Sequence, residues 1–343
     1  VLHRQAALQK QAVDGEPPPF EAVPVPAEAD EVAIRRGRLP APVDGDVFLD
    51  YEGHPFWTAA HDLFFMFGLL TRNASGDWVY EAWWAHDRED EKASTAKLIN
   101  WIAARRAQHP GCHVYHYNHT EKSSLVRLAA EYGTEESSLA ELVDAGVFVD
   151  VLDVVRQRVR VGAESYSLKV LEVVAGYERS HEIDKGSGAV LDYDAWCTDH
   201  LQERLDRIAT YNEDDVRATM AVRDWLLANP LAGEAHRPAL VPDDEDDVDV
   251  GEVVAGLMET GEEWKMLLAH LLTYWDREGR AHWAQHVPLL EAQASDQLTH
   301  PEVIGGLVFV GTRPPEGRQR EDRAVFKFPP QELSPDIVSG KNK

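Results

Sequence analysis

The sequence has few cysteines, no long apolar run and no signal-peptide pattern in its first residues. Its only cysteines are Cys112 and Cys197, too few for a disulfide framework or a four-cysteine zinc site. No stretch reaches the roughly 18 apolar residues of a membrane-spanning helix, and residues 1–5 lack the apolar core of a secretion signal. We therefore expect a cytoplasmic protein without a membrane span. Because the chain starts at Val1 and not at methionine, we also expect a fragment or a processed product.

Basic charge is scarce as well. The chain has 34 Lys and Arg against 60 Asp and Glu, a formal net charge of −26. Proteins that bind nucleic-acid phosphates usually present a basic face, so the composition alone argues against that partner. Two features weaken this objection: clustered carboxylates bind cations that reverse the local charge, and much of the acid lies in one run at 243–249. We expect weak substrate binding by this chain alone.

Proline, glycine and charge divide the chain into three parts. Residues 1–42 contain a proline-rich stretch at 17–26 and are predicted to be an N-terminal extension or linker. Residues 43–230 are predicted to form the main domain. Residues 231–343 are predicted to hold the acidic linker, a helical segment and the start of a following domain.

The main domain has an α/β pattern. Three strands in an antiparallel meander come first, then short strands alternate with helices, and helices end the domain. The predicted strands are 47–52, 61–70, 78–84, 112–117 and 147–149. The predicted helices are 89–108, 121–132, 151–160, 167–174 and 193–227. A mainly helical C-terminal extension follows, with a predicted helix at 262–283 and strand-like runs at 306–310 and 324–328.

The first candidate site residues are Asp50 and Glu52, at the end of an apolar strand. Residues two apart on a strand project from the same face. Two carboxylates on one face repel each other unless a cation joins them, and Mg²⁺ or Mn²⁺ prefers such oxygen ligands. The alternative is a solvated strand end or an ion pair with a later Lys or Arg.

The second candidate motif is Tyr211-Asn212-Glu213-Asp214-Asp215, inside a helix with a regular apolar spacing. Tyr211 and Asp215 are four residues apart and share one helix face. The spacing places Asp215 on or beside the buried stripe, where a lone carboxylate would need a partner. An exposed acidic patch fits Glu213 well, Asp214 in part and Asp215 poorly.

The third motif surrounds Glu121, just past a strand end and at the start of a helix. An acid near a helix N-terminus is also favourable without any further role. A zinc site of Cys112, His113, His116 and His119 is disfavoured, because residues three apart on a strand point to opposite faces. Asp150 and Asp153, after another strand, are interpreted as helix caps.

Together and in this order, the three motifs resemble those of the DEDD superfamily of 3′–5′ exonucleases, which has the RNase H-like fold. Asp50 and Glu52 match its first motif, Glu121 its second, and Tyr211 with Asp215 its third, in the tyrosine-bearing variety. The second motif usually holds Asp, so Glu121 departs from the pattern but keeps the carboxylate.

More narrowly, residues 45–53, 166–169 and 211–216 look like a group of large bacterial proteins. These have an N-terminal RecB-like nuclease, a central RNase H-like domain and a C-terminal superfamily 1 helicase. Residues 270–278 and 305–307 resemble that group's bridge into the helicase. The chain lacks the helicase phosphate loop, so it cannot hydrolyse ATP by that route.

The resemblance implies an RNase H-like mixed sheet with flanking helices and two-metal hydrolysis of a phosphodiester in single-stranded DNA or RNA. Asp50 would bridge two Mg²⁺ or Mn²⁺ ions, and Glu52, Glu121 and Asp215 would complete their ligands. Tyr211 is a poor base at neutral pH and is assigned to orienting the attacking water.

Two residues are candidates for substrate contact. Lys169 is predicted to contact a substrate phosphate, although a solvated helix charge fits it equally. Asn118 is the second candidate for substrate binding. Two other functions stay open: a nuclease-like module that only binds nucleic acid or braces its neighbours, and a phosphodiesterase for small nucleotides.

Overall fold

The computed structural model describes residues 2–13, 15–24, 31–58, 61–180, 187–237, 250–272, 274, 298, 303–313, 323–331 and 333. The chain divides into two compact units, residues 1–277 and 278–343. The acidic run at 243–249 and the predicted helix beyond residue 274 lie outside the described residues. The domain boundaries predicted at residues 42 and 230 stay a prediction.

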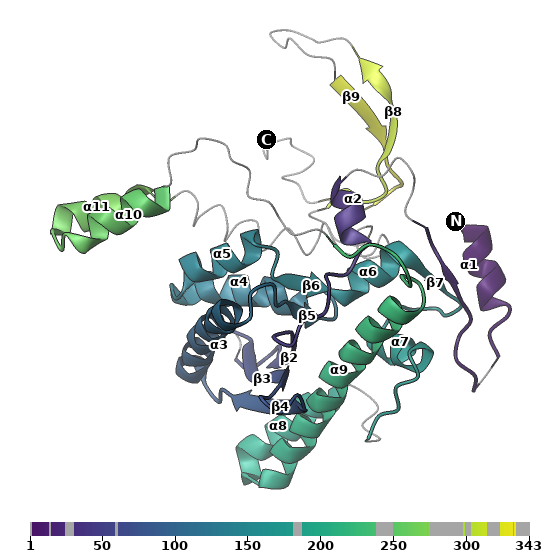
Figure 1. Cartoon of the computed structure of the whole chain (residues 1–343), viewed down its shortest axis with the longest axis horizontal. Coiled ribbons are helices and arrows are strands. Elements are labelled where there is room, and N and C mark those ends of the chain that lie inside the picture. Colours follow the sequence, from purple (N-terminus) through teal and green to yellow (C-terminus); the bar gives the residue numbers. More distant parts are fainter. Residues whose placement is uncertain are drawn as a thin grey trace. The chain divides into compact units, whose positions relative to one another are not determined.

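A five-stranded mixed sheet lies at the centre of the first unit, with strand order β4-β3-β2-β5-β6 (Figure 1). β2, β3 and β4 form an antiparallel meander, while β5 joins β2, and β6 joins β5, in parallel. The strands are β2 (Val47–His54), β3 (Leu63–Arg72), β4 (Trp78–Trp84), β5 (Val114–His116) and β6 (Phe148–Asp150). The predicted α/β architecture, with its meander first, is confirmed.

Helices cover both faces of this sheet. One face packs against α3 (Arg88–Gln108), α4 (Thr120–Tyr132) and α5 (Glu136–Asp144), and the other against α6 (Val151–Arg158), α7 (Leu168–Val174) and α9 (Gln202–Ala228). Side chains alternate along a strand, so Leu49 faces the first group and Phe48 the second. Asp50 and Glu52 share the orientation of Phe48. They therefore point to the face that α9 covers.

The single helix predicted at 193–227 is wrong, because two helices occupy this region. α8 (Ser187–Asp199) ends before His200, and α9 begins at Gln202. His200 has a φ of 53°, a left-handed conformation that an α-helix cannot continue. A carboxylate oxygen of Asp199 accepts the Leu201 amide at 3.0 Å. The break lets α8 fold back onto α9, where Tyr193 packs beside Leu205 and Ile208.

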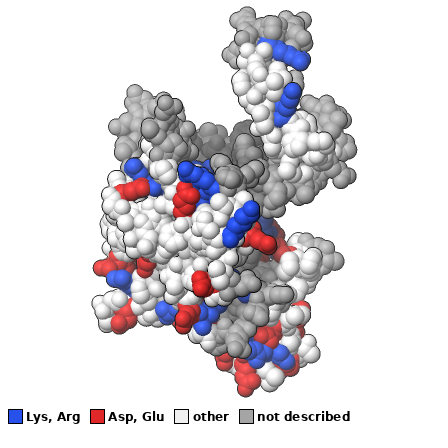
Figure 2. Space-filling view, turned by 90° about the vertical axis from the view of Figure 1, so that its right-hand side faces the viewer, with Lys and Arg blue, Asp and Glu red and all other residues white. Residues whose placement is uncertain are grey.

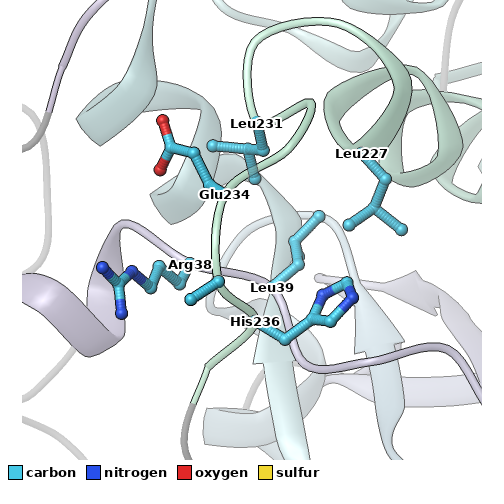
Figure 3. A pocket seen from close by; sticks show the side chains of 7 residues that line it. Arg38, Leu39, Leu227, Leu231, Glu234 and His236 are labelled. Carbon is cyan, nitrogen blue, oxygen red and sulfur yellow. The ribbon is translucent and has the colours of Figure 1, made fainter.

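The N-terminal residues attach to the main domain. They form α1 (Leu2–Gln9), β1 (Phe20–Ala22) and α2 (Glu31–Arg36), and β1 pairs antiparallel with β7 (Val159–Val161). Buried Arg158 donates to the carbonyls of Val23 at 2.7 Å and Gly37 at 2.9 Å, and it pairs with Glu234. Nearby, a small pocket is lined by Arg38 and Leu39, by Leu227 at the end of α9, and by four residues that follow it, Leu231, Glu234, Ala235 and His236 (Figure 3).

The C-terminal elements are a helix pair and a hairpin. α10 (Val250–Glu259) packs on α11 (Glu263–Leu272), and in the second unit β8 (Val308–Arg313) pairs antiparallel with β9 (Arg323–Lys327). α11 starts the helix predicted at 262, and β8 and β9 overlap the predicted strand-like runs. Within the described ranges, no helix is long and apolar enough to cross a membrane.

Charged side chains are mixed on the molecular surface. On the face drawn in Figure 2, blue Lys and Arg atoms lie among red Asp and Glu atoms and many uncharged residues. The described residues of this face form no continuous basic surface.

Candidate metal centre

Three acidic side chains meet where β2 and α9 cross. Asp50 and Glu52 project from one face of β2, and Asp215 projects toward them from α9. One carboxylate oxygen from each of the three lies within 4.8 Å of the other two. No other three His, Cys, Asp or Glu side chains among the described residues gather this closely. The β2–β3 pairing shifts register between Glu52 and Gly53, a local irregularity that is common beside active sites.

Asn212, which lies on α9, forms hydrogen bonds to both acids of β2. Its Nδ2 donates to Asp50 Oδ2 at 2.9 Å and to Glu52 Oε1 at 3.3 Å, while its Oδ1 accepts the Tyr80 hydroxyl at 2.9 Å. Gly68 lies opposite Asp50 on β3, and a Cβ at that position would come within 1.6 Å of Asn212 Oδ1. The glycine therefore provides the space that lets α9 approach the sheet here.

Burial and mutual repulsion oppose ionisation of these acids. Burial raises the pKa of Asp50 well above its ordinary range, and the charges of its acidic neighbours, Asp215 first, raise it further. Burial is also the main cause that raises the pKa of Glu52 to about 8, followed by the charge of Asp215. The pKa of Asp215 is raised by burial, although the Arg179 guanidinium opposes this. The cluster thus carries a free-energy cost that a cation would remove.

Glu121 lies beside this cluster at the N-terminus of α4. Its charge contributes to the raised pKa of Asp50, but it is not one of the three closely gathered acids. The carboxylate is buried, and Oε2 has no hydrogen-bond partner among the described residues, with His116 Nδ1 at 3.5 Å. Burial alone would lower the pKa of His116, but Glu121 and Asp150 raise it. Glu121 therefore lies near Asp50, with Oε2 in an ion pair with His116 and outside hydrogen-bond geometry.

Tyr211 lies one helical turn before Asp215. Its pKa is raised, first by burial and then by the charges of Asp215 and Glu52, so the phenol keeps its proton at neutral pH. Interaction with Tyr211 also lowers the pKa of the Asp215 carboxyl, which places the two side chains near each other. Tyr211 can thus hold a neighbour in position but cannot remove a proton from water.

Arg179 is a cation that contacts the cluster directly, through Asp215. Its Nη2 donates to Asp215 Oδ1 at 2.5 Å and to Glu172 Oε2 at 2.7 Å, and its Nε donates to Glu172 Oε1 at 2.8 Å. Asp214 fixes the same segment, because it accepts the Tyr177 hydroxyl at 2.7 Å and the Ser180 amide at 3.1 Å. Asp214 is buried, so it does not belong to an exposed acidic patch, the alternative that fitted it in part.

The two candidates for substrate contact lie in different surroundings. Lys169 Nζ is 5.8 Å from the centre of the Tyr211 ring, beside the site. Asn118 has a φ of 82° and uses its side-chain oxygen to accept the amide of His119 at 2.9 Å. Asp150 caps α6, as predicted, and also accepts the Asn118 amide at 3.0 Å. The roles of Lys169 and Asn118 stay predictions.

The residues present fit a divalent cation. The donors are carboxylate oxygens, the ligands that Mg²⁺ and Mn²⁺ prefer. The three gathered acids carry the repulsion that a cation offsets, and Glu121 Oε2 is a buried acceptor whose ion-pair partner, His116 Nδ1 at 3.5 Å, makes no hydrogen bond to it. The cluster can therefore bind a metal ion, with Asp50, Glu52 and Asp215 as its nearest ligands.

Sequence reasoning missed three parts of the centre. No role was predicted for Asn212, although its spacing of four from Ile208 and Val216 predicts burial. Gly68 interrupts an apolar strand, which is a known sign of close backbone approach. Arg179 gives no such signal, since it is a single basic residue in a loop.

Comparison with known proteins gives one match. A family model described as RNase_H superfamily matches residues 47–227, which is 181 of the 343 residues. The matched range contains the whole five-stranded sheet and all residues of the centre. No curated protein and no solved structure matches the chain. The family match and the mixed sheet together confirm the predicted RNase H-like fold.

Proposed function

The chain belongs to the RNase_H superfamily, and from this premise we propose that it is a divalent-metal-dependent nuclease that hydrolyses phosphodiesters. The finer proposal is a 3′–5′ exonuclease that acts on single-stranded DNA or RNA ends with two Mg²⁺ or Mn²⁺ ions. The gathering of Asp50, Glu52 and Asp215 within 4.8 Å is the observation that carries the metal-dependent nuclease, while the 3′–5′ polarity and the single-stranded substrate rest on the motif resemblance. Buried carboxylates this close together lower the stability of the protein when no cation binds them, and this cost favours a catalytic role for them.

Bound cations would supply Lewis-acid stabilisation for the charge that develops on the phosphodiester oxygens. Asp50, Glu52 and Asp215 would hold them, with Glu121 as a fourth ligand. Asn212 keeps the two β2 carboxylates in place through its amide donors. These side chains come from β2, α4 and α9, rigid elements that fix an arrangement more precisely than loops do.

Tyr211 acts as a positioning residue in this proposal. Because its pKa is raised, the phenol keeps its proton, which it donates toward Asp215. Its oxygen can then accept a hydrogen bond from the attacking water, and this orients the water's lone pair toward phosphorus. Proton removal from that water is not assigned to Tyr211.

A larger context is also proposed, on the motif resemblance alone. Residues 45–53, 166–169 and 211–216 support a place between a RecB-like nuclease and a helicase in one longer chain. In that setting a helicase would deliver single strands, which compensates for the mixed surface charge of this chain. Co-purified or fused flanking domains would then raise its affinity for long strands.

The test is a cleavage assay on an end-labelled single-stranded oligonucleotide with Mn²⁺, Mg²⁺ or EDTA. We expect a ladder shortened from the 3′ end with cations, and none with EDTA or with Asp50→Asn. Glu213→Gln is the matched control, because this half-exposed acid of α9 pairs with Arg217. Cleavage that survives Asp50→Asn would refute the assignment, and retained binding without cleavage by the wild type would indicate a non-catalytic module.

A further inference from the structure

One guanidinium nitrogen beside the metal centre has no acceptor. Arg179 uses Nε and Nη2 for its contacts with Glu172 and Asp215. Its Nη1 is buried and has no hydrogen-bond partner among the described residues. An unsatisfied donor on a charged group is costly. The Arg179 side chain as a whole keeps 12% of its surface exposed.

The orientation of Arg179 is fixed. Glu172 is 7% exposed at its side chain and receives two parallel hydrogen bonds from the guanidinium, the bidentate geometry that suits arginine best. The same guanidinium lies 5.6 Å from the centre of the Tyr211 ring, and Lys169 Nζ lies 5.8 Å from that centre. Two cations thus flank the tyrosine that stands beside the acids.

We propose that Arg179 is the phosphate-binding residue of this site, and that Nη1 donates to a non-bridging phosphodiester oxygen of the strand bound at the acids. Glu172 is its positioning residue. This inference rests on the proposed function, since it assigns the part of the same site that recognises the nucleic-acid backbone. Arginine is well suited to the role because its planar donors match phosphate oxygens.

Charge makes this binding depend on the metal ions. With no cation at the acids, Arg179 already faces Glu172 and Asp215, so one positive charge is shared by two negative ones. A phosphate would meet net repulsion there. Once a divalent cation takes up the charge of Asp215, the guanidinium can attract an anion. Cation binding and phosphate binding are therefore positively coupled, and each strengthens the other.

The experiment measures binding by fluorescence anisotropy with a 5′-fluorescein-labelled oligothymidylate, in Ca²⁺ or in EDTA, and a gel shows that the probe stays intact. A second probe carries uncharged methylphosphonate linkages at its 3′ end. The variants are Arg179→Met and the double variant Glu172→Gln/Arg179→Met, which avoids a lone buried carboxylate. Arg217→Met is the matched control, because it removes an arginine that pairs with Glu213 on α9.

In Ca²⁺ we expect both Arg179 variants to bind the charged probe about ten-fold or more weakly than the wild type. The methylphosphonate probe should bind equally to variants and wild type, and Arg217→Met should bind both probes normally. In EDTA the difference between variants and wild type should vanish. Equal binding of the charged probe by Arg179→Met and Arg217→Met would overturn the inference. The proposed function would still stand in that case if wild-type cleavage required a cation and Asp50.

Discussion

Replacing Glu52 with Gln should stabilise the metal-free protein, an unusual result for a buried and hydrogen-bonded residue. Burial and the charge of Asp215 raise the pKa of Glu52 from its ordinary value near 4.5 to about 8. The folded state therefore binds this proton more tightly than the unfolded state does. The contribution of Glu52 to the free energy of unfolding is therefore fully present below about pH 4.5 and is lost as the pH rises toward about 8.

The size of the effect follows from the same shift. One pKa unit corresponds to about 1.4 kcal/mol, so at pH 7, 2.5 units above the ordinary value, the loss is about 3 kcal/mol. Glutamine has no charge and keeps an oxygen for the Asn212 amide, which Glu52 accepts at 3.3 Å. In EDTA at pH 7, the free energy of unfolding of Glu52→Gln should therefore exceed that of the wild type by about 3 kcal/mol. Near pH 4.5 the two free energies of unfolding should differ little.

The assay is urea unfolding followed by circular dichroism, in EDTA, across this pH range. Glu213→Gln serves as the control, since it removes an acid of α9 whose charge is shared with Arg217. Saturating Mn²⁺ should stabilise the wild type strongly and Glu52→Gln much less. The reasoning is refuted if Glu52→Gln is less stable than the wild type in EDTA at pH 7, or if its gain does not depend on pH.

Two other substitutions probe the packing around the acids. Gly68→Ala should destabilise the protein by about 1–3 kcal/mol and lower its affinity for cations, because the added Cβ would displace the Asn212 side chain. Thermal unfolding with and without Mn²⁺ measures the stability and the Mn²⁺ affinity, and an unchanged Mn²⁺ affinity would contradict the role of Asn212. Tyr211→Phe should lower kcat about 10- to 100-fold with little change in KM and no change in the shape of the pH–rate profile; steady-state cleavage rates check this, and loss of an ionisation step would show that the phenol acts as a base.

The fold could be predicted largely from local sequence patterns. The antiparallel meander and the helix at 89–108 have clear periodicity, and their bounds agree closely with β2, β3, β4 and α3. The prediction of a single helix at 193–227 was wrong because His200 takes a left-handed backbone conformation, which a histidine in the sequence does not predict. The short pairing of β1 with β7 also escaped prediction, since it joins three-residue strands that are far apart in sequence.

The acids of the site were chosen from the sequence, but the way they are held could not be. Asp50 and Glu52 follow from alternation on a strand, and Asp215 from its place near an apolar helix stripe. Arg179 is a different case: its contact with Asp215 depends on the path of a loop, which no local pattern encodes. Tertiary contacts of this kind are decided by packing, and a sequence shows them only where a residue such as Gly68 marks a close approach.

Direct measurement of cation binding tests the central claim, that these buried acids gather to hold metal ions. Electron paramagnetic resonance of free Mn²⁺ during titration counts the bound ions without any need for substrate. The wild type should bind Mn²⁺ with two ions per chain at saturation, while Asp50→Asn and Asp215→Asn should each lose tight binding and Glu213→Gln should not. Equal Mn²⁺ binding by the wild type and Asp50→Asn would contradict the account.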